Sequence, residues 1–124
     1  MNEQCILIVE DRGPLLAAVR EILEMEGYNV LVALDGTQAL QVMEEFRPDL
    51  IVADILMPRM DGYTFYDEVR AHPEWAAIPF VFLTAKAEQE DVDRAKDMGV
   101  DAYIIKPFDH QYLLAVIRAQ LEGS

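Results

Sequence analysis

Five polar side chains that could take part in phosphate or metal chemistry each follow a short apolar run. Glu10 and Asp11 follow the first run, Asp54 the third, Thr84 the fourth and Lys106 the fifth. If these runs are parallel strands of one sheet, their carboxyl ends meet at one edge, where such sheets bind ligands. Three carboxylates, a hydroxyl and an ammonium are therefore expected to lie together.

These groups suit phosphoryl chemistry assisted by a metal ion. Crowded carboxylates repel one another unless a cation joins them, and Glu10, Asp11 and Asp54 offer the oxygen ligands that Mg²⁺ prefers, with Mn²⁺ as a second candidate. Asp54 can then act as nucleophile toward a phosphorylated donor and hold an aspartyl phosphate. Lys106 would offset charge on the phosphoryl oxygens, and the Thr84 hydroxyl would donate to one of them.

The same groups predict a conformational switch. If Thr84 moves toward a phosphoryl group, the space that it leaves can be filled by an aromatic ring from the fifth strand, and Tyr103 is the candidate. Simple packing is the alternative interpretation of Tyr103, because aromatic residues are common on strands. Capping of the first helix is the alternative interpretation of Glu10 and Asp11. The convergence of five polar groups on one edge favours a functional site.

Alternating strand and helix patterns predict the fold that would bring these residues together. The apolar runs of strand length are Cys5–Val9, Val30–Ala33, Leu50–Ala53, Phe80–Leu83 and Ala102–Ile105. Helical patterns lie between them, from Pro14 to a stop at Gly27, from about Thr37 to Phe46, from Asp61 and Gly62 to before Pro73, from about Gln89 to Met98, and from His110 to Leu121. Most of the runs are apolar throughout, as in strands covered on both faces by helices. We expect an α/β, doubly wound, five-stranded parallel sheet of the flavodoxin-like (βα)5 type with strand order 2-1-3-4-5.

Composition limits the function further. The 124 residues include 23 acidic and 10 basic ones, giving a net charge of −13. Such a charge repels phosphate backbones and anionic lipids, so we expect neither direct nucleic-acid binding nor membrane association. A single cysteine, Cys5, lies in an apolar run, and the apolar runs are too short to span a membrane. These features predict a cytoplasmic protein without a disulfide framework.

Four short motifs resemble the signatures of response-regulator receiver domains in two-component signalling. They are V-E-D ending at Asp11, D-I-L-M-P-R-M-D-G beginning at Asp54, T-A beginning at Thr84, and K-P-F beginning at Lys106. They stand in that family's order, and the intervals of 30 residues from Asp54 to Thr84 and 22 from Thr84 to Lys106 are similar to the family's. The resemblance spans residues 1–124, which we therefore interpret as a single receiver domain.

The resemblance implies a role for each matching position. It implies metal coordination by Glu10, Asp11, Asp54 and the backbone carbonyl of Leu56, phosphoacceptance by Asp54, phosphate contacts from Thr84 and Lys106, switching by Thr84 and Tyr103, and a cis peptide bond before Pro107. A histidine kinase or histidine phosphotransfer protein would be the donor. The surface of the fourth helix, fifth strand and fifth helix would then change and contact a protein target or a second copy of the chain. The chain would catalyse only its own phosphorylation and dephosphorylation.

The loop after the acidic pair departs from the family pattern. Arg12, Gly13 and Pro14 stand where the family more often has polar or acidic residues before its first helix. Arg12 could therefore compete for the carboxylates, which would alter metal affinity, or contact a partner. His72 and His110 are expected at the surface, away from the strand-end cluster, and Trp75 at the opposite end of the sheet.

Three other functions are compatible with parts of the pattern. A receiver-like module could dock a partner without being phosphorylated, although the complete set of five polar groups disfavours this. A phosphatase of the haloacid-dehalogenase kind would need a D-x-D motif after the first strand, which the sequence lacks. A flavodoxin-like electron carrier is disfavoured because the acidic loop after the first strand would repel a flavin phosphate.

Overall fold

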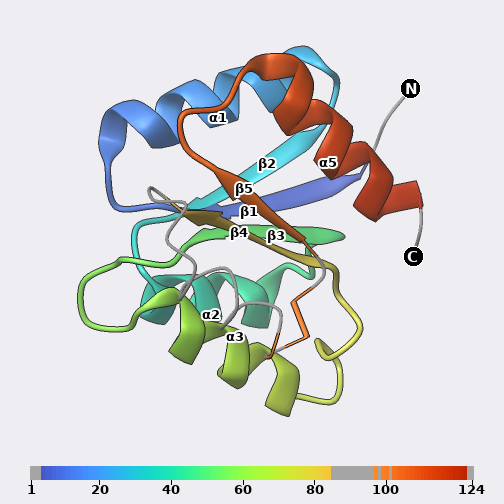
Figure 1. The fold of residues 1–124 in the computed structure, drawn as a ribbon. Helices are drawn as coiled ribbons and strands as arrows, with labels where there is room; N and C mark the ends of the chain where they lie inside the picture. The colour runs from blue at the N-terminus through green and yellow to red at the C-terminus, as the bar shows by residue number, and fades with distance from the viewer. Residues whose placement is uncertain (1–3, 85–96, 98, 101, 123–124) are drawn as a thin grey trace.

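The computed structural model confirms the predicted fold class (Figure 1). It describes residues 4–84, 97, 99–100 and 102–122. The strands are β1 (Cys5–Val9), β2 (Asn29–Ala33), β3 (Leu50–Asp54), β4 (Phe80–Thr84) and β5 (Ala102–Ile105). The helices are α1 (Gly13–Met25), α2 (Gly36–Glu45), α3 (Gly62–Ala71) and α5 (His110–Glu122). All strand pairs are parallel, in the order β2-β1-β3-β4-β5. The predicted fourth helix, from about Gln89 to Met98, lies outside the described residues except at Asp97.

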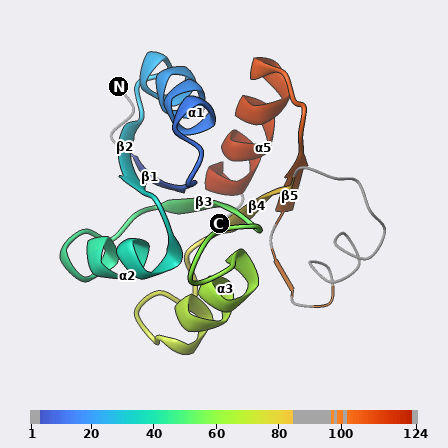
Figure 2. The ribbon, with the colours of Figure 1, turned by 90° about the vertical axis from the view of Figure 1, so that its left-hand side faces the viewer.

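Helices cover both faces of the sheet, which explains the continuously apolar strands. Figure 2 shows α1 and α5 on one face and α2 and α3 on the other. Side chains alternate between the two faces along a strand, so Phe80 and Phe82 pack toward α2 and α3, whereas Val81 and Leu83 pack toward α1 and α5. Every residue of β3 and β4 is buried. The carboxyl ends of these strands are consequently held rigidly.

Two aspartates are the N-cap residues of the helices that follow β2 and β3. The Asp35 carboxylate accepts a hydrogen bond of 2.8 Å from the backbone N–H of Gln38, and Asp61 accepts one of 2.8 Å from that of Thr64. The Gln38 amide oxygen accepts from the backbone N–H of Leu34 at 2.7 Å, one residue before the N-cap. Both caps satisfy amide groups that a helix start leaves unpaired. They fix where α2 and α3 leave the carboxyl edge of the sheet.

The loop between β3 and α3 is attached to the start of α2. Arg59 adopts a left-handed backbone conformation with φ of 67°, which is uncommon for a residue other than glycine. Its guanidinium forms an ion pair of 3.2 Å with the buried carboxylate of Asp35. The Met60 side chain lies so close to the Cα of Gly36 that a Cβ there would require it to move. The loop that carries Leu56 therefore has two contacts with the neighbouring helix.

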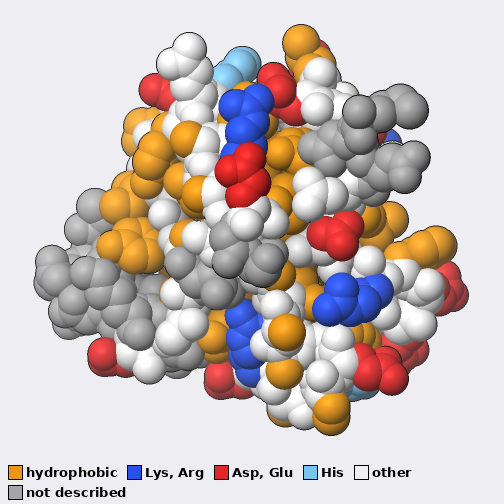
Figure 3. Space-filling model, turned by 90° about the vertical axis from the view of Figure 1, so that its right-hand side faces the viewer, with side chains coloured by type: hydrophobic (Ala, Val, Ile, Leu, Met, Phe, Trp, Pro, Cys, Tyr) orange, Lys and Arg blue, Asp and Glu red, His pale blue; other side chains and the backbone are white. Residues whose placement is uncertain are grey.

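The opposite end of the sheet contains the connection from α3 to β4 (Figure 1). Trp75 in this connection is buried, and its ring stacks on that of His72 with 3.9 Å between centroids. Figure 3 shows the molecule from this end, where the few basic side chains are separated by acidic and apolar ones. Among the described residues, no helix combines the length and apolar character needed to cross a membrane.

Candidate phosphorylation site

The ladder of the parallel sheet brings the polar residues to one edge. The backbone N–H of Glu10 donates to the carbonyl of Ala33 at 3.0 Å, and that of Lys106 donates to the carbonyl of Thr84 at 2.7 Å. Asp54, the last residue of β3, pairs with Leu83 of β4. The backbone of each of these residues is therefore still paired with a neighbouring strand at the end of the sheet. The site is built on rigid elements at the edge where ligands bind in such sheets.

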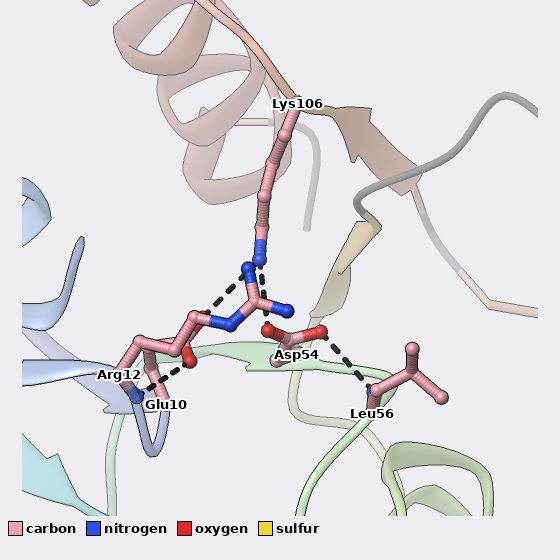
Figure 4. Close-up of polar contacts among 5 residues, drawn as sticks. All are labelled: Glu10, Arg12, Asp54, Leu56 and Lys106. Atoms are coloured by element: carbon pink, nitrogen blue, oxygen red, sulfur yellow. Dashed lines mark hydrogen bonds and ion pairs between the residues drawn. The ribbon is translucent and has the colours of Figure 1, made fainter.

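Asp54 is the central carboxylate of the edge. It is only 2% exposed, and its Oδ2 accepts a hydrogen bond of 2.8 Å from the Lys106 ammonium (Figure 4). Its Oδ1 accepts one of 3.2 Å from the backbone N–H of Leu56. Both oxygens thus have donors, and the aspartate is held at the floor of the site with its charge compensated.

Glu10 is fully buried beside Asp54 and shares the same ammonium. Its Oε1 lies 3.3 Å from the Lys106 Nζ, and its Oε2 accepts a hydrogen bond of 2.9 Å from the backbone N–H of Arg12. One ammonium therefore serves two buried carboxylates. When both carboxylates are ionised, their summed charge with the Lys106 ammonium is negative.

The two carboxylates have different pKa values because burial and their mutual contacts act on them differently. Burial, together with the neighbouring Asp54, raises the pKa of Glu10 from 4.5 to about 7. Burial also acts to raise the pKa of Asp54, but its hydrogen bonds with Glu10 and Lys106 and the lysine charge bring that pKa below 3.8. Asp54 is accordingly the ionised member of the pair at neutral pH, while Glu10 keeps its proton to a higher pH in the metal-free protein.

Asp11 completes a set of three acidic groups. One carboxylate oxygen from each of Glu10, Asp11 and Asp54 lies within 4.8 Å of the other two. Asp11 is exposed, whereas the other two are buried, so the cluster opens to solvent on one side. An all-oxygen donor set with excess negative charge and an open side matches the preference of Mg²⁺, which keeps several water ligands. The residues present therefore fit the expected metal.

The predicted switch residues lie on one face of the sheet. Thr84 is buried at the end of β4, and Tyr103 of β5 pairs in register with Phe82. Because side chains alternate, Thr84 and Tyr103 both face α2 and α3, where Tyr103 is partly buried against the core. The Lys106–Pro107 peptide bond is cis. Leu56 is 65% exposed, and its backbone N–H donates to the Asp54 carboxylate.

A hollow beside the site is lined by apolar and basic side chains. It has a volume of about 770 Å³, with an apolar wall from α1 and from the loop between β5 and α5. Arg12, Lys106 and His110 line it. His110 is exposed, as predicted, and lines this hollow from the start of α5. Arg12, predicted either to compete for the carboxylates or to contact a partner, lines the hollow together with Lys106.

The chain matches the model of the response regulator receiver domain over residues 6–118. The chain therefore belongs to the receiver domain family of two-component response regulators.

Known proteins support the same assignment. The sequence is 40% identical over 121 residues to the DNA-binding response regulator MtrA of Mycobacterium tuberculosis, covering 98% of this chain and 52% of MtrA. The fold is similar to the receiver domain of a signal transduction histidine kinase from Syntrophus aciditrophicus, with 35% identity, a TM-score of 0.90 and coverage of 97% and 91% of the two chains. It is also similar to the receiver domain of the sensor histidine kinase PA1611 from Pseudomonas aeruginosa, which has a magnesium ion coordinated in its active-site cleft. That pair has 33% identity, a TM-score of 0.90 and coverage of 99% and 100%.

The relatives correct the expectation about nucleic acid. The chain spans about half the length of the curated relatives that it matches, and MtrA is named as a DNA-binding regulator. The inference from a net charge of −13 that direct nucleic-acid binding is absent is therefore wrong as a statement about the protein. Net charge describes only the residues counted, and receiver domains of this family are joined to other segments in such relatives.

Proposed function

We propose that residues 1–124 form one receiver domain that accepts a phosphoryl group on Asp54 and relays a signal. The observation that carries this proposal is the position of Asp54, an ionised carboxylate at the end of β3 beside two acidic neighbours and 2.8 Å from the Lys106 ammonium. A histidine kinase or histidine phosphotransfer protein would supply the phosphoryl group. The chain would catalyse only the gain and loss of its own phosphoryl group.

Magnesium would be held by Glu10, Asp11, Asp54 and the backbone carbonyl of Leu56, with Mn²⁺ as an alternative ion. The close approach of the three carboxylate oxygens supports this assignment, because three acidic groups gathered around one ammonium leave negative charge that a divalent cation can neutralise. The bound ion would supply positive charge to the carboxylates and to the oxygens of the transferred group.

The remaining side chains would position and compensate the phosphoryl group. Asp54 would attack the phosphorus atom with one carboxylate oxygen. Lys106, which already contacts Asp54, would remain beside the product and offset its added charge. Thr84 would donate its hydroxyl to a phosphoryl oxygen, and Tyr103 would move into the space behind it on the same face of the sheet.

The response of the whole protein would be directed at DNA through a segment beyond the receiver domain. This inference rests on MtrA, of which the chain covers about half. A cytoplasmic location belongs to the same proposal, since a protein that acts on DNA must reach it.

Intact-protein mass spectrometry after incubation with acetyl phosphate tests the proposal. We expect a gain of one phosphoryl group that requires Mg²⁺ and is lost in mild base, as an acyl phosphate is. Asp54→Asn should gain none, because its amide is not a nucleophile, whereas Asp61→Asn should be labelled normally because Asp61 only caps α3. Full labelling of Asp54→Asn, or no labelling of the wild-type protein with Mg²⁺ bound, would contradict the assignment.

A further inference from the structure

Arg12 extends over the mouth of the phosphorylation site. Its backbone N–H is bound to Glu10, while its side chain is exposed and reaches toward the Lys106 ammonium and the Asp54 carboxylate (Figure 4). Arg12 and Lys106 also line the same hollow. A second cation is thus exposed at the hollow that Lys106 lines.

The guanidinium has unused hydrogen-bonding capacity. Within the described ranges, with their gaps at 85–96, 98 and 101, it forms neither a hydrogen bond nor an ion pair with a carboxylate. The nearby oxygens are already engaged, because both Glu10 oxygens and both Asp54 oxygens accept from Lys106 or from backbone N–H groups. Arginine carries five N–H donors in a planar arrangement that matches phosphate oxygens.

The electrostatics of the site call for such a cation. Even with a divalent ion bound, three carboxylates, one ammonium and that ion leave no net positive charge to attract a phosphate dianion. A guanidinium at the open side would attract the dianion without adding to the charges that hold Asp54. It would act before transfer, when the donor is still outside the floor of the site.

We propose that Arg12 is a substrate-binding cation that contacts the phosphoryl oxygens of the donor at the mouth of the site. This inference rests on the proposed function of Asp54. In the reaction with acetyl phosphate, an Asp54 oxygen forms a bond to phosphorus, the bond from phosphorus to the acetate oxygen breaks, and acetate leaves with the electron pair. Arg12 keeps its proton throughout and binds the non-bridging oxygens, favouring dianionic donors.

The test compares the wild-type protein with Arg12→Gln and Arg12→Lys at saturating Mg²⁺. Arg20→Gln is the matched control, because Arg20 is an exposed arginine of α1 whose only described ion pair is with Glu24 at 3.4 Å. The initial rate of labelling is measured against acetyl phosphate concentration. We expect Arg12→Gln to raise the half-saturating concentration about tenfold, Arg12→Lys to recover part of the loss, and Arg20→Gln to match the wild type.

A binding measurement separates this proposal from that of phosphotransfer. Asp54→Asn with bound Mg²⁺ is titrated with inorganic phosphate by isothermal calorimetry, with and without Arg12→Gln, and Mg²⁺ affinity is measured in parallel. Weaker phosphate binding with Mg²⁺ affinity unchanged or increased supports the role of Arg12, even if the wild-type protein takes no label. Unchanged phosphate affinity and an unchanged half-saturating concentration would overturn it. If tighter Mg²⁺ binding were the sole effect of Arg12→Gln, the proposal would be overturned as well, since Arg12 would then act only by repelling the metal ion.

Discussion

One ammonium between two buried carboxylates explains most of the chemistry of the site at the scale of single residues. Lys106 lies closer to Asp54, at 2.8 Å, than to Glu10, at 3.3 Å. Burial raises the pKa of Glu10, whereas hydrogen bonds with Glu10 and Lys106 lower the pKa of Asp54. Asp54 therefore keeps its negative charge, and Glu10 retains its proton to a higher pH. This difference suits the proposed roles, because the nucleophile must be ionised while a metal ligand can release its proton as the metal binds.

Magnesium affinity should increase with pH through Glu10. The pKa of Glu10 is raised from 4.5 to about 7, so the metal must displace a proton below that pH. If only the ionised form binds, the apparent affinity should increase about tenfold between pH 6 and pH 8. By the same linkage the metal-free fold loses stability as pH rises from about 4.5 to 7, because the folded state binds this proton more tightly than the unfolded state. Calorimetric Mg²⁺ titrations at several pH values measure the first effect.

Two variants identify the titrating group. Glu10→Gln should bind Mg²⁺ more weakly and lose the pH dependence in this range. Asp11→Asn should also bind weakly but keep it, because the exposed Asp11 makes no contact with Lys106 among the described ion pairs. Equal pH dependence in the wild-type protein and in Glu10→Gln would contradict the assignment.

At the scale of elements, the start of α3 is packed against the backbone at the end of β3. The backbone N–H of Gly62 donates to the carbonyl of Ile55 at 2.7 Å, and a Cβ at Gly62 would collide with the carbonyl oxygen of Asp54. Gly62→Ala should therefore destabilise the fold by about 1–3 kcal/mol and displace Asp54. Urea unfolding measures the stability, and labelling by acetyl phosphate measures the effect on the site.

Gly13→Ala provides the comparison for that variant. A Cβ at Gly13 would meet no atom within 4 Å, although Gly13 also begins a helix beside the site. It should leave both stability and labelling close to wild type. A Gly62→Ala protein as stable as Gly13→Ala would show that α3 can move away from β3 without cost.

The sequence predicted the strands and their ends well, because burial along a strand is visible in the residue pattern. It predicted poorly those contacts that depend on the conformation of a loop. Apolar runs ending in a polar residue located Asp54 and Lys106 at the edge, because strand burial and strand ends are local properties. The ion pair between Arg59 and Asp35 had no signal in the sequence, since it depends on a left-handed residue in the loop.

At the scale of the whole molecule, the two ends of the sheet differ. The carboxyl end carries the polar site, and the opposite end, called the structural end below, carries the connection from α3 to β4. The acidic cluster and the hollow lie where the strands end, and the connection from α3 to β4 lies at the other end (Figure 1). Between them lies a core of fully buried side chains that includes Phe65, Phe80 and Phe82. Because a close-packed core is not continuously deformable, a charge change at one end alters the packing at the other only if an element moves as a unit.

Trp75 should therefore report unfolding but not metal binding. It is the single tryptophan, it is buried at the structural end, and it stacks on His72. Saturating Mg²⁺ should change its fluorescence by only a few per cent, roughly the level expected without altered packing, whereas urea unfolding should shift its emission to longer wavelength. A tryptophan placed at the exposed position 56, as Leu56→Trp in a Trp75→Phe background, should instead respond to Mg²⁺ because the main chain of Leu56 contacts Asp54. A large Mg²⁺ response from Trp75 in the wild-type protein would show that binding at the carboxyl edge rearranges the whole sheet, and the separation of the two ends would then be incorrect.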